Sequence, residues 1–176
     1  MIRYIAFLRG INVSGKKLIK MEDLREHFKM PGFKNIVTYI QSGNVLFDTA
    51  ETDEGLLRKK IEKRILQKTG FEVTTILRTL DEIGATIKKN PFGTINNDDP
   101  KKLYVTFLAG LPEKKLCTVL ENFSNDGETL KVINRETYLL TGGYADTRFS
   151  NTFVEKKLGM AATTRNWATV NKVLEL

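Results

Sequence analysis

The segment Ile36-Val37-Thr38-Tyr39-Ile40-Gln41-Ser42-Gly43-Asn44-Val45-Leu46-Phe47 decides how this chain folds. Two runs rich in β-branched and aromatic residues, 36–40 and 45–47, flank the small and polar residues 41–44. That composition is typical of strands, and a connection this short demands antiparallel pairing. The sequence therefore predicts a β-hairpin, which argues against a wholly parallel sheet.

With the elements on either side of the hairpin, the first half of the chain has a predicted βαββαβ order. Residues 2–8 are nearly all apolar and stop at Arg9-Gly10, as a strand does. Residues 21–28 carry apolar side chains at helical spacing, and residues 54–69 do so again before Gly70. A strand is expected at 73–77. This order predicts a ferredoxin-like unit, with an antiparallel sheet and both helices on one face.

The second half repeats the order loosely, as βαββα. The expected elements are a strand at 103–108, a helix whose first residue is Pro112, a hairpin of 130–133 with 138–140, a short helix opened by the capping box Thr152-x-x-Glu155, and a last helix capped by Thr163 or Thr164. The sequence thus predicts an α+β fold of two ferredoxin-like units, at 1–78 and 102–176. A connecting helix and loop at 79–101 begin with a second capping box, Thr79-x-x-Glu82.

Composition is that of an ordinary globular protein. The chain has 176 residues, of which 41% are hydrophobic, and no window approaches eighteen consecutive apolar residues. The first residues enter strand-like sequence directly, without the pattern of a signal peptide. The chain has one cysteine, Cys117, and one histidine, His27. A single cysteine forms no disulfide within the chain, and the two residues together do not make a zinc ligand set. We therefore expect a cytoplasmic protein with no membrane segment, metal or cofactor.

Positive charge is concentrated near the N-terminus. The chain has 28 Lys and Arg against 21 Asp and Glu, for a formal charge of +7, and the first 50 residues hold eight of the former and four of the latter. Such an excess favours phosphate-bearing partners, although a solvated surface without a partner explains it as well. The distribution indicates a basic face around residues 9–17.

Residues 10–16 match the nucleotide-binding pattern G-x-x-x-x-G-K. Lys17 stands where that pattern needs a Ser or Thr hydroxyl for magnesium, and Leu18-Ile19-Lys20 separates the loop from the next helix. With an antiparallel hairpin in the same unit, these departures argue against a P-loop enzyme. Backbone amides near Gly10 and Gly15 remain able to cradle an anion, with charge from Arg9, Lys16 and Lys17. The alternative is a pair of glycine turns with solvated lysines.

Two other polar clusters extend the predicted site. Residues 41–44 concentrate amides and hydroxyls, and we hypothesise that they converge with the glycine loop. In the second half, Arg165 is placed to reach an anion at the N-terminus of the last helix. In the alternative interpretation, Thr163 and Thr164 cap that helix and Trp167 fills the core. The predicted ligand-binding residues are Arg9, Gly10, Asn12, Gly15, Lys16, Lys17, Gln41, Ser42, Asn44, Arg165 and Asn166.

Three stretches together resemble the bacterial domain-of-unknown-function family numbered 1697. They are Tyr4-Ile5-Ala6-Phe7-Leu8-Arg9-Gly10-Ile11-Asn12-Val13 with Gly15-Lys16, then Thr38-Tyr39-Ile40-Gln41-Ser42-Gly43-Asn44-Val45, and Thr163-Thr164-Arg165-Asn166-Trp167. The resemblance implies an α+β protein with ferredoxin-like units and supplies no activity. Ser14 departs from a glycine that the family often has, and Ala168 from a polar residue.

Three functions stay open from the sequence. The first is a module that binds a phosphate-bearing ligand, either a nucleic acid or a nucleotide-like metabolite. The second is a cofactor-free enzyme in which Arg9, Lys16 and Asn12 stabilise an anionic transition state. The third is a homo-oligomeric interaction protein without a small ligand. His27 and Cys117 are interpreted as structural residues, so neither identifies a catalytic site. The sequence does not decide whether the protein is an enzyme.

Overall fold

The structure is a computed structural model, and it describes residues 1–96 and 98–176. Asn97, inside the expected connecting segment 79–101, lies outside the described residues. The chain divides into two compact units, which are described separately below. Unit 1 comprises Met1–Ile83 with Val173–Leu176, and unit 2 comprises Gly84–Lys172. The last four residues of the chain thus belong to the first unit.

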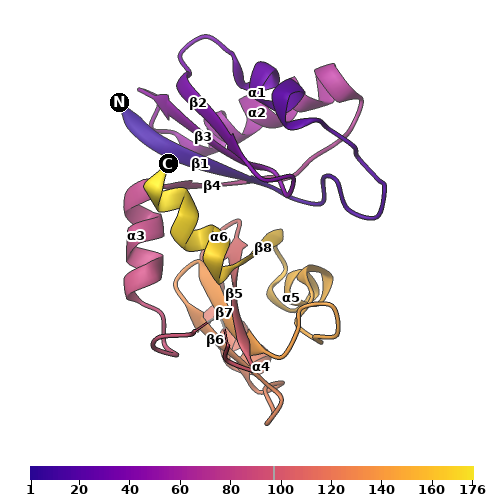
Figure 1. Cartoon of the computed structure of the whole chain (residues 1–176), viewed down its shortest axis with the longest axis vertical. Coiled ribbons are helices and arrows are strands. Elements are labelled where there is room, and N and C mark those ends of the chain that lie inside the picture. The colour runs from indigo at the N-terminus through magenta and orange to yellow at the C-terminus, as the bar shows by residue number, and fades with distance from the viewer. Residues whose placement is uncertain (97) are drawn as a thin grey trace. The chain divides into compact units, whose positions relative to one another are not determined.

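Unit 1 is a four-stranded antiparallel sheet with helices packed on it (Figure 1). Its elements are β1 Ile2–Leu8, α1 Met21–Phe28, β2 Lys34–Tyr39, β3 Asn44–Thr49, α2 Glu54–Thr69 and β4 Thr75–Thr79, with the 3-10 helix Val173–Glu175 at the C-terminus. The strand order is β2-β3-β1-β4. In the centre, Ala6 of β1 pairs with Val45 of β3 on one side and with Leu77 of β4 on the other.

The core of unit 1 forms because every second side chain of β1 points to the face on which both helices place their apolar side chains. Tyr4, Ala6 and Leu8 belong to one buried cluster with side chains of both helices, among them Phe28 and Ile61. Residues two apart on a strand share a face, so α1 and α2 cover the same face of the sheet. This is the packing that the βαββαβ order of elements predicted.

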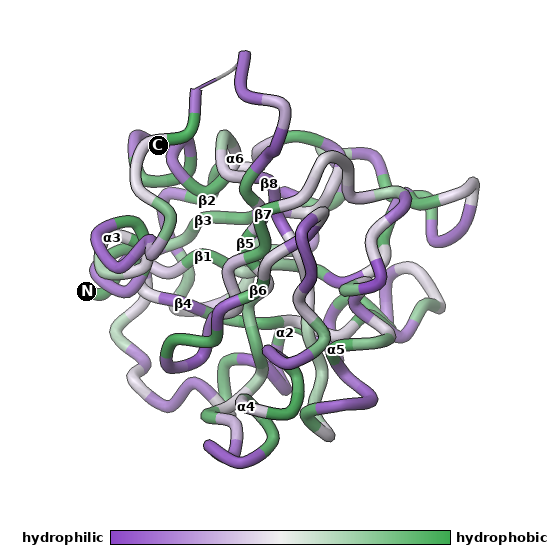
Figure 2. The backbone as a smooth tube through the Cα atoms, turned by 90° about the horizontal axis from the view of Figure 1, so that it is seen from below, coloured by the Kyte–Doolittle hydropathy of each residue, from purple (hydrophilic) through white to green (hydrophobic). Residues whose placement is uncertain are grey.

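Unit 2 repeats the arrangement. Its elements are β5 Lys102–Leu108, α4 Lys114–Glu121, β6 Glu128–Ile133, β7 Glu136–Thr141, α5 Asn151–Leu158, β8 Ala162–Asn166 and α6 Trp167–Lys172, and α3 Leu80–Lys88 begins in unit 1 and ends in unit 2. The strand order is β6-β7-β5-β8, again antiparallel. Helix α4 carries both hydrophobic and hydrophilic residues (Figure 2) and buries Leu120, as expected for a helix with one buried side.

Individual backbone hydrogen bonds also recur in the two units. The Leu8 amide donates to the Gly43 carbonyl at 2.8 Å, and the Leu108 amide donates to the Arg135 carbonyl at 2.9 Å. One residue further on, Arg9 N–H donates to Thr74 O and Ala109 N–H donates to Ala161 O, both at 2.9 Å. The end of β1 is therefore structurally equivalent to the end of β5, and the loops that follow these strands can be compared directly.

The structure corrects the prediction for the end of unit 2. Thr163 and Thr164 cap no helix, because they lie in β8 and pair with Phe107 and Thr106 of β5. The amide of Thr169 in α6 is instead capped by Asn166 Oδ1, at 2.8 Å. The strand was missed because threonine favours both strands and helix caps, so its β-branched side chain did not decide between them.

Two other expected helix starts in unit 2 are wrong. Pro112 precedes α4, which begins at Lys114. The hydroxyl that caps α5 belongs to Ser150 and accepts from Phe153 N–H at 3.3 Å, so Thr152-x-x-Glu155 is not a capping box. Glu155 Oε1 instead accepts from the Ala162 amide at 2.9 Å and so supports the start of β8.

Other local predictions are confirmed. Thr79 and Glu82 form the expected capping box, in which Thr79 N–H donates to Glu82 Oε2 at 2.8 Å and Glu82 N–H donates to Thr79 Oγ1 at 3.2 Å. Helix α2 spans the predicted residues and ends at Gly70, whose φ of 73° is left-handed. Among the helices described, none is long and apolar enough to cross a bilayer.

Gly43 is the position at which the hairpin most needs glycine. A Cβ there would lie 2.7 Å from Ile11 Cδ1 and 2.9 Å from Leu8 Cβ, and φ is +79°. We expect Gly43→Ala to lower the free energy of unfolding by about 2–4 kcal/mol, from overpacking and left-handed strain together.

Urea denaturation measures this change, with Gly110→Ala as the matched control. A Cβ at Gly110 has no neighbour within 4 Å, so its effect should stay within about 0.5 kcal/mol. Equal effects of the two substitutions would contradict the close approach of Gly43 and Ile11.

Candidate functional site

The candidate site lies at the end of β1, where residues 9–20 form what we call the long loop (Figure 1, indigo). The tip of the loop is a tight turn in which Lys16 N–H donates to Val13 O at 3.0 Å. Ser14 and Gly15 in the middle of this turn have φ of 50° and 72°, as in a type I′ turn. The G-x-x-x-x-G-K segment is therefore a small hairpin and not a phosphate loop that opens a helix.

Asn12 holds the base of this hairpin. Its Nδ2 donates to Ile19 O at 3.0 Å and to Gln41 O at 2.9 Å, while its Oδ1 accepts from Ile19 N–H at 2.8 Å. Asn12 N–H also donates to Lys17 O at 3.2 Å. One side chain thus closes the long loop and ties it to the β2–β3 turn, residues 40–43.

The hypothesised convergence of these two segments is confirmed by the contacts. Besides the Asn12 to Gln41 hydrogen bond, Ile11 is 1% exposed and approaches Gly43 closely. We call the combined surface of residues 9–20 and 40–43 the loop surface. It places Lys16, Gln41 and Ser42 in solvent, and all three were predicted from the sequence as ligand contacts.

Several residues of the loop surface have left-handed backbones. In addition to the glycines, Asn12, Ser14, Lys17 and Ile40 have φ between 45° and 55°. Asn tolerates this region, but for Lys and especially for β-branched Ile it costs on the order of 1 kcal/mol or more. The surrounding hydrogen bonds therefore hold a strained arrangement, a feature that is concentrated at functional sites.

Other predicted contacts are engaged in holding the structure together. Asn44 is fully buried, and its Nδ2 donates to Tyr39 O at 2.9 Å and to Ser42 Oγ at 3.0 Å. Lys17 Nζ donates to Glu72 O, which ties the loop to the segment between α2 and β4. Arg9 is half-buried, whereas Gly10, Gly15 and Lys16 are exposed.

The equivalent loop of unit 2 differs sharply. It has five residues, 109–113, between β5 and α4, whereas the long loop has twelve, 9–20, between β1 and α1. The sequence of the short loop is Ala-Gly-Leu-Pro-Glu, with no cation and one acid, whereas the long loop has four cations and no acid. The β6–β7 turn is also shorter, with two residues against four in the β2–β3 turn.

Arg165 and Asn166, the remaining predicted contacts, belong to unit 2. Arg165 is buried, and its Nη1 donates to Thr163 Oγ1 and to Thr164 O, both at 2.9 Å. Burial lowers the pKa of its guanidinium to about 10. Asn166 borders a cavity of about 280 Å³ with Trp167, Tyr104 and Lys102.

Near Arg165, Thr164 Oγ1 joins a chain of hydroxyl and amide groups. It lies 2.8 Å from Thr106 Oγ1, accepts from Tyr144 Oη at 3.0 Å and donates to Asn151 Oδ1 at 2.7 Å. These four side chains link β5, β8, α5 and the segment before α5. The network was not predicted, because its members are far apart in sequence, and their mutual hydrogen bonds indicate a structural role.

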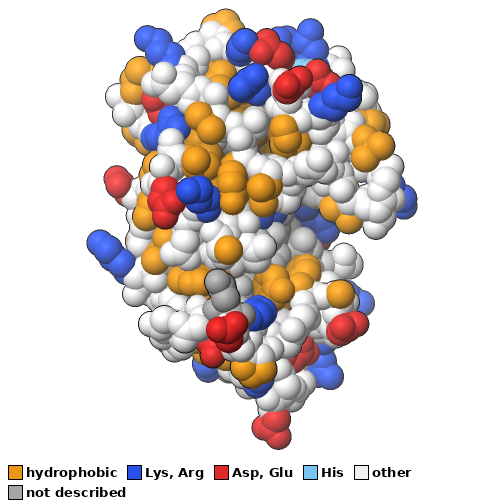
Figure 3. All heavy atoms as spheres, viewed as in Figure 1, with side chains coloured by type: hydrophobic (Ala, Val, Ile, Leu, Met, Phe, Trp, Pro, Cys, Tyr) orange, Lys and Arg blue, Asp and Glu red, His pale blue; other side chains and the backbone are white. Residues whose placement is uncertain are grey.

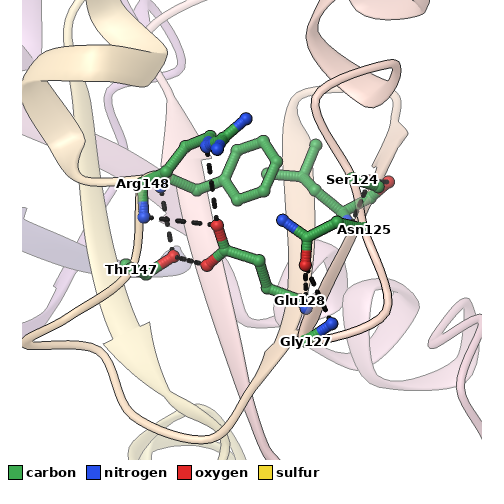
Figure 4. Close-up of polar contacts among 8 residues, drawn as sticks. Ser124, Asn125, Gly127, Glu128, Thr147 and Arg148 are labelled. Atoms are coloured by element: carbon green, nitrogen blue, oxygen red, sulfur yellow. Dashed lines mark hydrogen bonds and ion pairs between the residues drawn. The ribbon is translucent and has the colours of Figure 1, made fainter.

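A second polar cluster in unit 2 surrounds Glu128 (Figure 4). Its carboxylate accepts from Thr147 Oγ1 and from Arg148 N–H, and Arg148 Nε lies 3.9 Å away. Asn125 Oδ1 accepts from the amides of Gly127 and Glu128, at 2.8 and 3.1 Å. The side chains point toward one another, so this cluster fixes the start of β6 to residues 147–148.

The surroundings of His27 and Cys117 do not activate either side chain for catalysis. Burial is the main cause that lowers the pKa of His27, with Arg64 and Lys68 adding to it and Asp23 and Glu26 opposing it. Burial, followed by Glu121, raises the pKa of the Cys117 thiol and so disfavours its reactive thiolate. Within residues 1–96 and 98–176, no group of three His, Cys, Asp or Glu side chains is arranged to hold a metal.

Comparison with known proteins gives the family. Residues 1–138, which include the whole loop surface, match the family described as "Protein of unknown function (DUF1697)". The chain belongs to the DUF1697 family. No curated protein matches the sequence.

A solved structure shares the fold of this chain. The conserved bacterial protein SP0830 from Streptococcus pneumoniae is 22% identical to this chain, with a TM-score of 0.76. The match covers 99% of this chain and 97% of that one. At this identity the likeness concerns the fold alone.

The Asn12 contacts generate a stability prediction. Asn12→Ala removes the side-chain donors and the acceptor that close the long loop, and takes two hydrogen bonds from the backbone of buried Ile19. We expect the free energy of unfolding to fall by about 1–3 kcal/mol and the Ile19 amide to exchange faster with deuterium.

The control substitution is Gln41→Ala. Asn12 uses the backbone carbonyl of Gln41, and the Gln41 side chain is exposed, so this change should cost under about 0.5 kcal/mol. Unchanged protection of Ile19 in the Asn12 variant would show that this side chain does not hold the loop.

Proposed function

We propose that the loop surface of unit 1 binds a phosphate-bearing ligand, either a nucleotide-like metabolite or a nucleic acid. The observation that carries this proposal is the contrast between the two equivalent loops. Unit 2 closes the same corner with five residues and no cation, whereas unit 1 uses twelve residues with Arg9, Lys16, Lys17 and Lys20. Closing the fold does not require the additional length or the charge, and long ordered loops commonly carry function.

The charge on this surface is available to an anion. Lys16 and Lys20 are exposed, and neither the long loop nor residues 40–43 contain an acid. The Asn12 hydrogen bonds fix the backbone beneath these side chains, so part of the entropy cost of forming a site is already met on folding. A fixed, acid-free array of cations favours phosphate over a neutral ligand.

Apolar side chains beside the lysines favour a ligand with an organic body. Val13, Leu18 and Ile40 are 57%, 66% and 45% exposed, which is unusual for three branched residues on two adjoining segments. An inorganic anion would leave them uncovered, whereas a nucleobase or a similar flat group would contact them. A ligand that combines a phosphate with such a group therefore suits the loop surface best.

The tyrosines of the sheet do not extend this site. Tyr4 is 4% exposed and stacks on Phe47 in the helix-side core, at a ring distance of 5.9 Å. Tyr104 packs against Tyr144 at 5.2 Å. Recognition that depends on bases stacking on sheet aromatics therefore receives no support from these two residues.

Binding is favoured over catalysis by the state of Asn12. The enzyme hypothesis used Arg9, Lys16 and Asn12 to stabilise an anionic transition state, but the amide of Asn12 is engaged in three hydrogen bonds within the loop surface. Asn12 then shapes the site and does not contact the reacting group.

We further propose that both units are ferredoxin-like, since each has the element order βαββαβ and its fourth strand beside its first. The expected division into 1–78, 79–101 and 102–176, the cytoplasmic location and the homo-oligomer stay predictions.

The ligand proposal predicts a charge-specific loss of binding. Replacing Lys16 and Lys20 with Ala should weaken binding of AMP or a short single-stranded oligonucleotide by about tenfold, or about 1.4 kcal/mol. For the single-stranded oligonucleotide, the negative slope of log K against log salt should become shallower by about 1.4, or about 0.7 for each lysine lost. Fluorescence anisotropy and calorimetry measure both quantities.

The matched control is Lys114→Ala with Lys115→Ala, which removes the same charge from two exposed residues in the first turn of α4, next to the short loop of unit 2. This pair should change affinity less than twofold. Equal loss in both double variants, or no saturable binding of either ligand to the wild type, would contradict the loop surface as the site.

A further inference from the structure

A second cationic feature of unit 1 lies between the end of α1 and helix α2. A cavity of about 250 Å³ is bordered by Lys29, Lys60, Lys63 and Arg64, together with Gln67 and the segment 30–31. No acid borders it. We call it the basic cavity, and it shares no residue with the loop surface.

The spacing of these residues on α2 places them on one side of the helix. Positions 60, 63, 64 and 67 follow the i, i+3, i+4, i+7 pattern, which on a packed helix is ordinarily apolar. Here the stripe carries three cations and one amide. Like charges three and four residues apart repel each other and destabilise a helix. These cations therefore do not serve to stabilise helix α2. Figure 3 shows Lys and Arg side chains gathered, with some acids among them, over the helices of unit 1.

Two of the four cations are held by protein groups. Lys60 Nζ donates to Pro31 O at 2.7 Å and lies 5.0 Å from the centre of the Phe33 ring. Lys29 Nζ lies 2.6 Å from Glu26 Oε1. Both ammonium groups therefore already have a partner within the protein.

The other two cations have no such partner. Arg64 Nε is buried without a hydrogen-bond partner, and within the described part of the chain Arg64 makes no ion pair. Lys63 likewise has no ion pair or hydrogen bond from its side chain among the described residues. A buried donor without an acceptor is costly, and a bound ion is one of the few arrangements that remove the cost.

We propose that the basic cavity binds the phosphate monoester or diphosphate group of a small soluble molecule, with Arg64 and Lys63 as its main contacts. Arg64 supplies a planar donor set that matches phosphate oxygens, and the lysines supply point charges around it. The volume lies below the range of about 300–1,000 Å³ usual for whole ligands, so it suits the phosphoryl group and not an entire molecule.

His27 on α1 provides an independent reporter of occupancy. Burial chiefly lowers its pKa, the charges of Arg64 and Lys68 lower it further, and Asp23 and Glu26 oppose them. An anion bound at Arg64 neutralises part of that positive field, so the His27 pKa rises on binding. The single histidine of the chain makes the titration simple to follow by NMR.

The test uses the whole chain labelled with 15N-arginine, titrated with inorganic pyrophosphate and with inorganic phosphate at constant ionic strength. The Arg64 Nε–H resonance, assigned by its loss in Arg64→Lys, should move saturably while the His27 pKa increases. Arg64→Gln and Lys63→Gln should each weaken pyrophosphate binding at least tenfold. Lys59→Gln, which removes an α2 charge outside the basic cavity, should weaken it less than twofold.

Three outcomes would overturn the proposal. The first is an Arg64 resonance that responds to pyrophosphate no more than to sodium chloride at equal ionic strength. The second is equal loss in Lys59→Gln and Lys63→Gln, which indicates diffuse attraction. The third is loss of binding in the Lys16 and Lys20 double variant with the cavity intact, which assigns the anion to the loop surface. Conversely, a saturable shift that survives this double variant supports the basic cavity whatever the loop surface binds.

Discussion

The hydrogen bonds of one amide side chain organise the long loop, which is the part of unit 1 that differs most from unit 2. Asn12 closes residues 9–20 into a small hairpin and attaches it to the carbonyl of Gln41 in the neighbouring turn. These bonds help to hold the left-handed backbones of Lys17 and Ile40, because neither residue type favours that conformation. The position of every exposed lysine and apolar side chain on the loop surface depends on this attachment.

The two units provide an internal comparison that is independent of any relative. The same amide-to-carbonyl bonds end β1 and β5, so the sheets need the same closure. Helix-to-strand contacts repeat too, since Glu62 Oε1 accepts from the Thr75 amide in unit 1 as Glu155 does from Ala162 in unit 2. Because the two units share these contacts, the length and charge of the long loop are what distinguish unit 1 from unit 2. The family assignment names the group of proteins and leaves function to be argued from such features.

Most of the fold could be predicted because local signals agreed with one another. The apolar residues at helical spacing and Gly70 at the end were sufficient to place α2, and the structure adds a cap by Asp53. Strand β8 could not be placed, since Thr163 and Thr164 suit a strand and a cap equally and only pairing with β5 decides. At the candidate site, the loop and turn were recognisable from composition. The engagement of Asn12 and Asn44 and the unpaired Arg64 depend on contacts between distant residues, which spacing does not reveal.

Chemical-shift mapping of the backbone amides during titration with AMP tests whether the loop surface is a preformed ligand site. Saturable shifts should appear together at Ser14, Gly15 and Lys16 and at Ser42, because Asn12 couples the two segments, while residues 109–113 of the short loop stay unchanged. Shifts confined to one segment, or spread equally over the long and short loops, would contradict a preformed site at the loop surface.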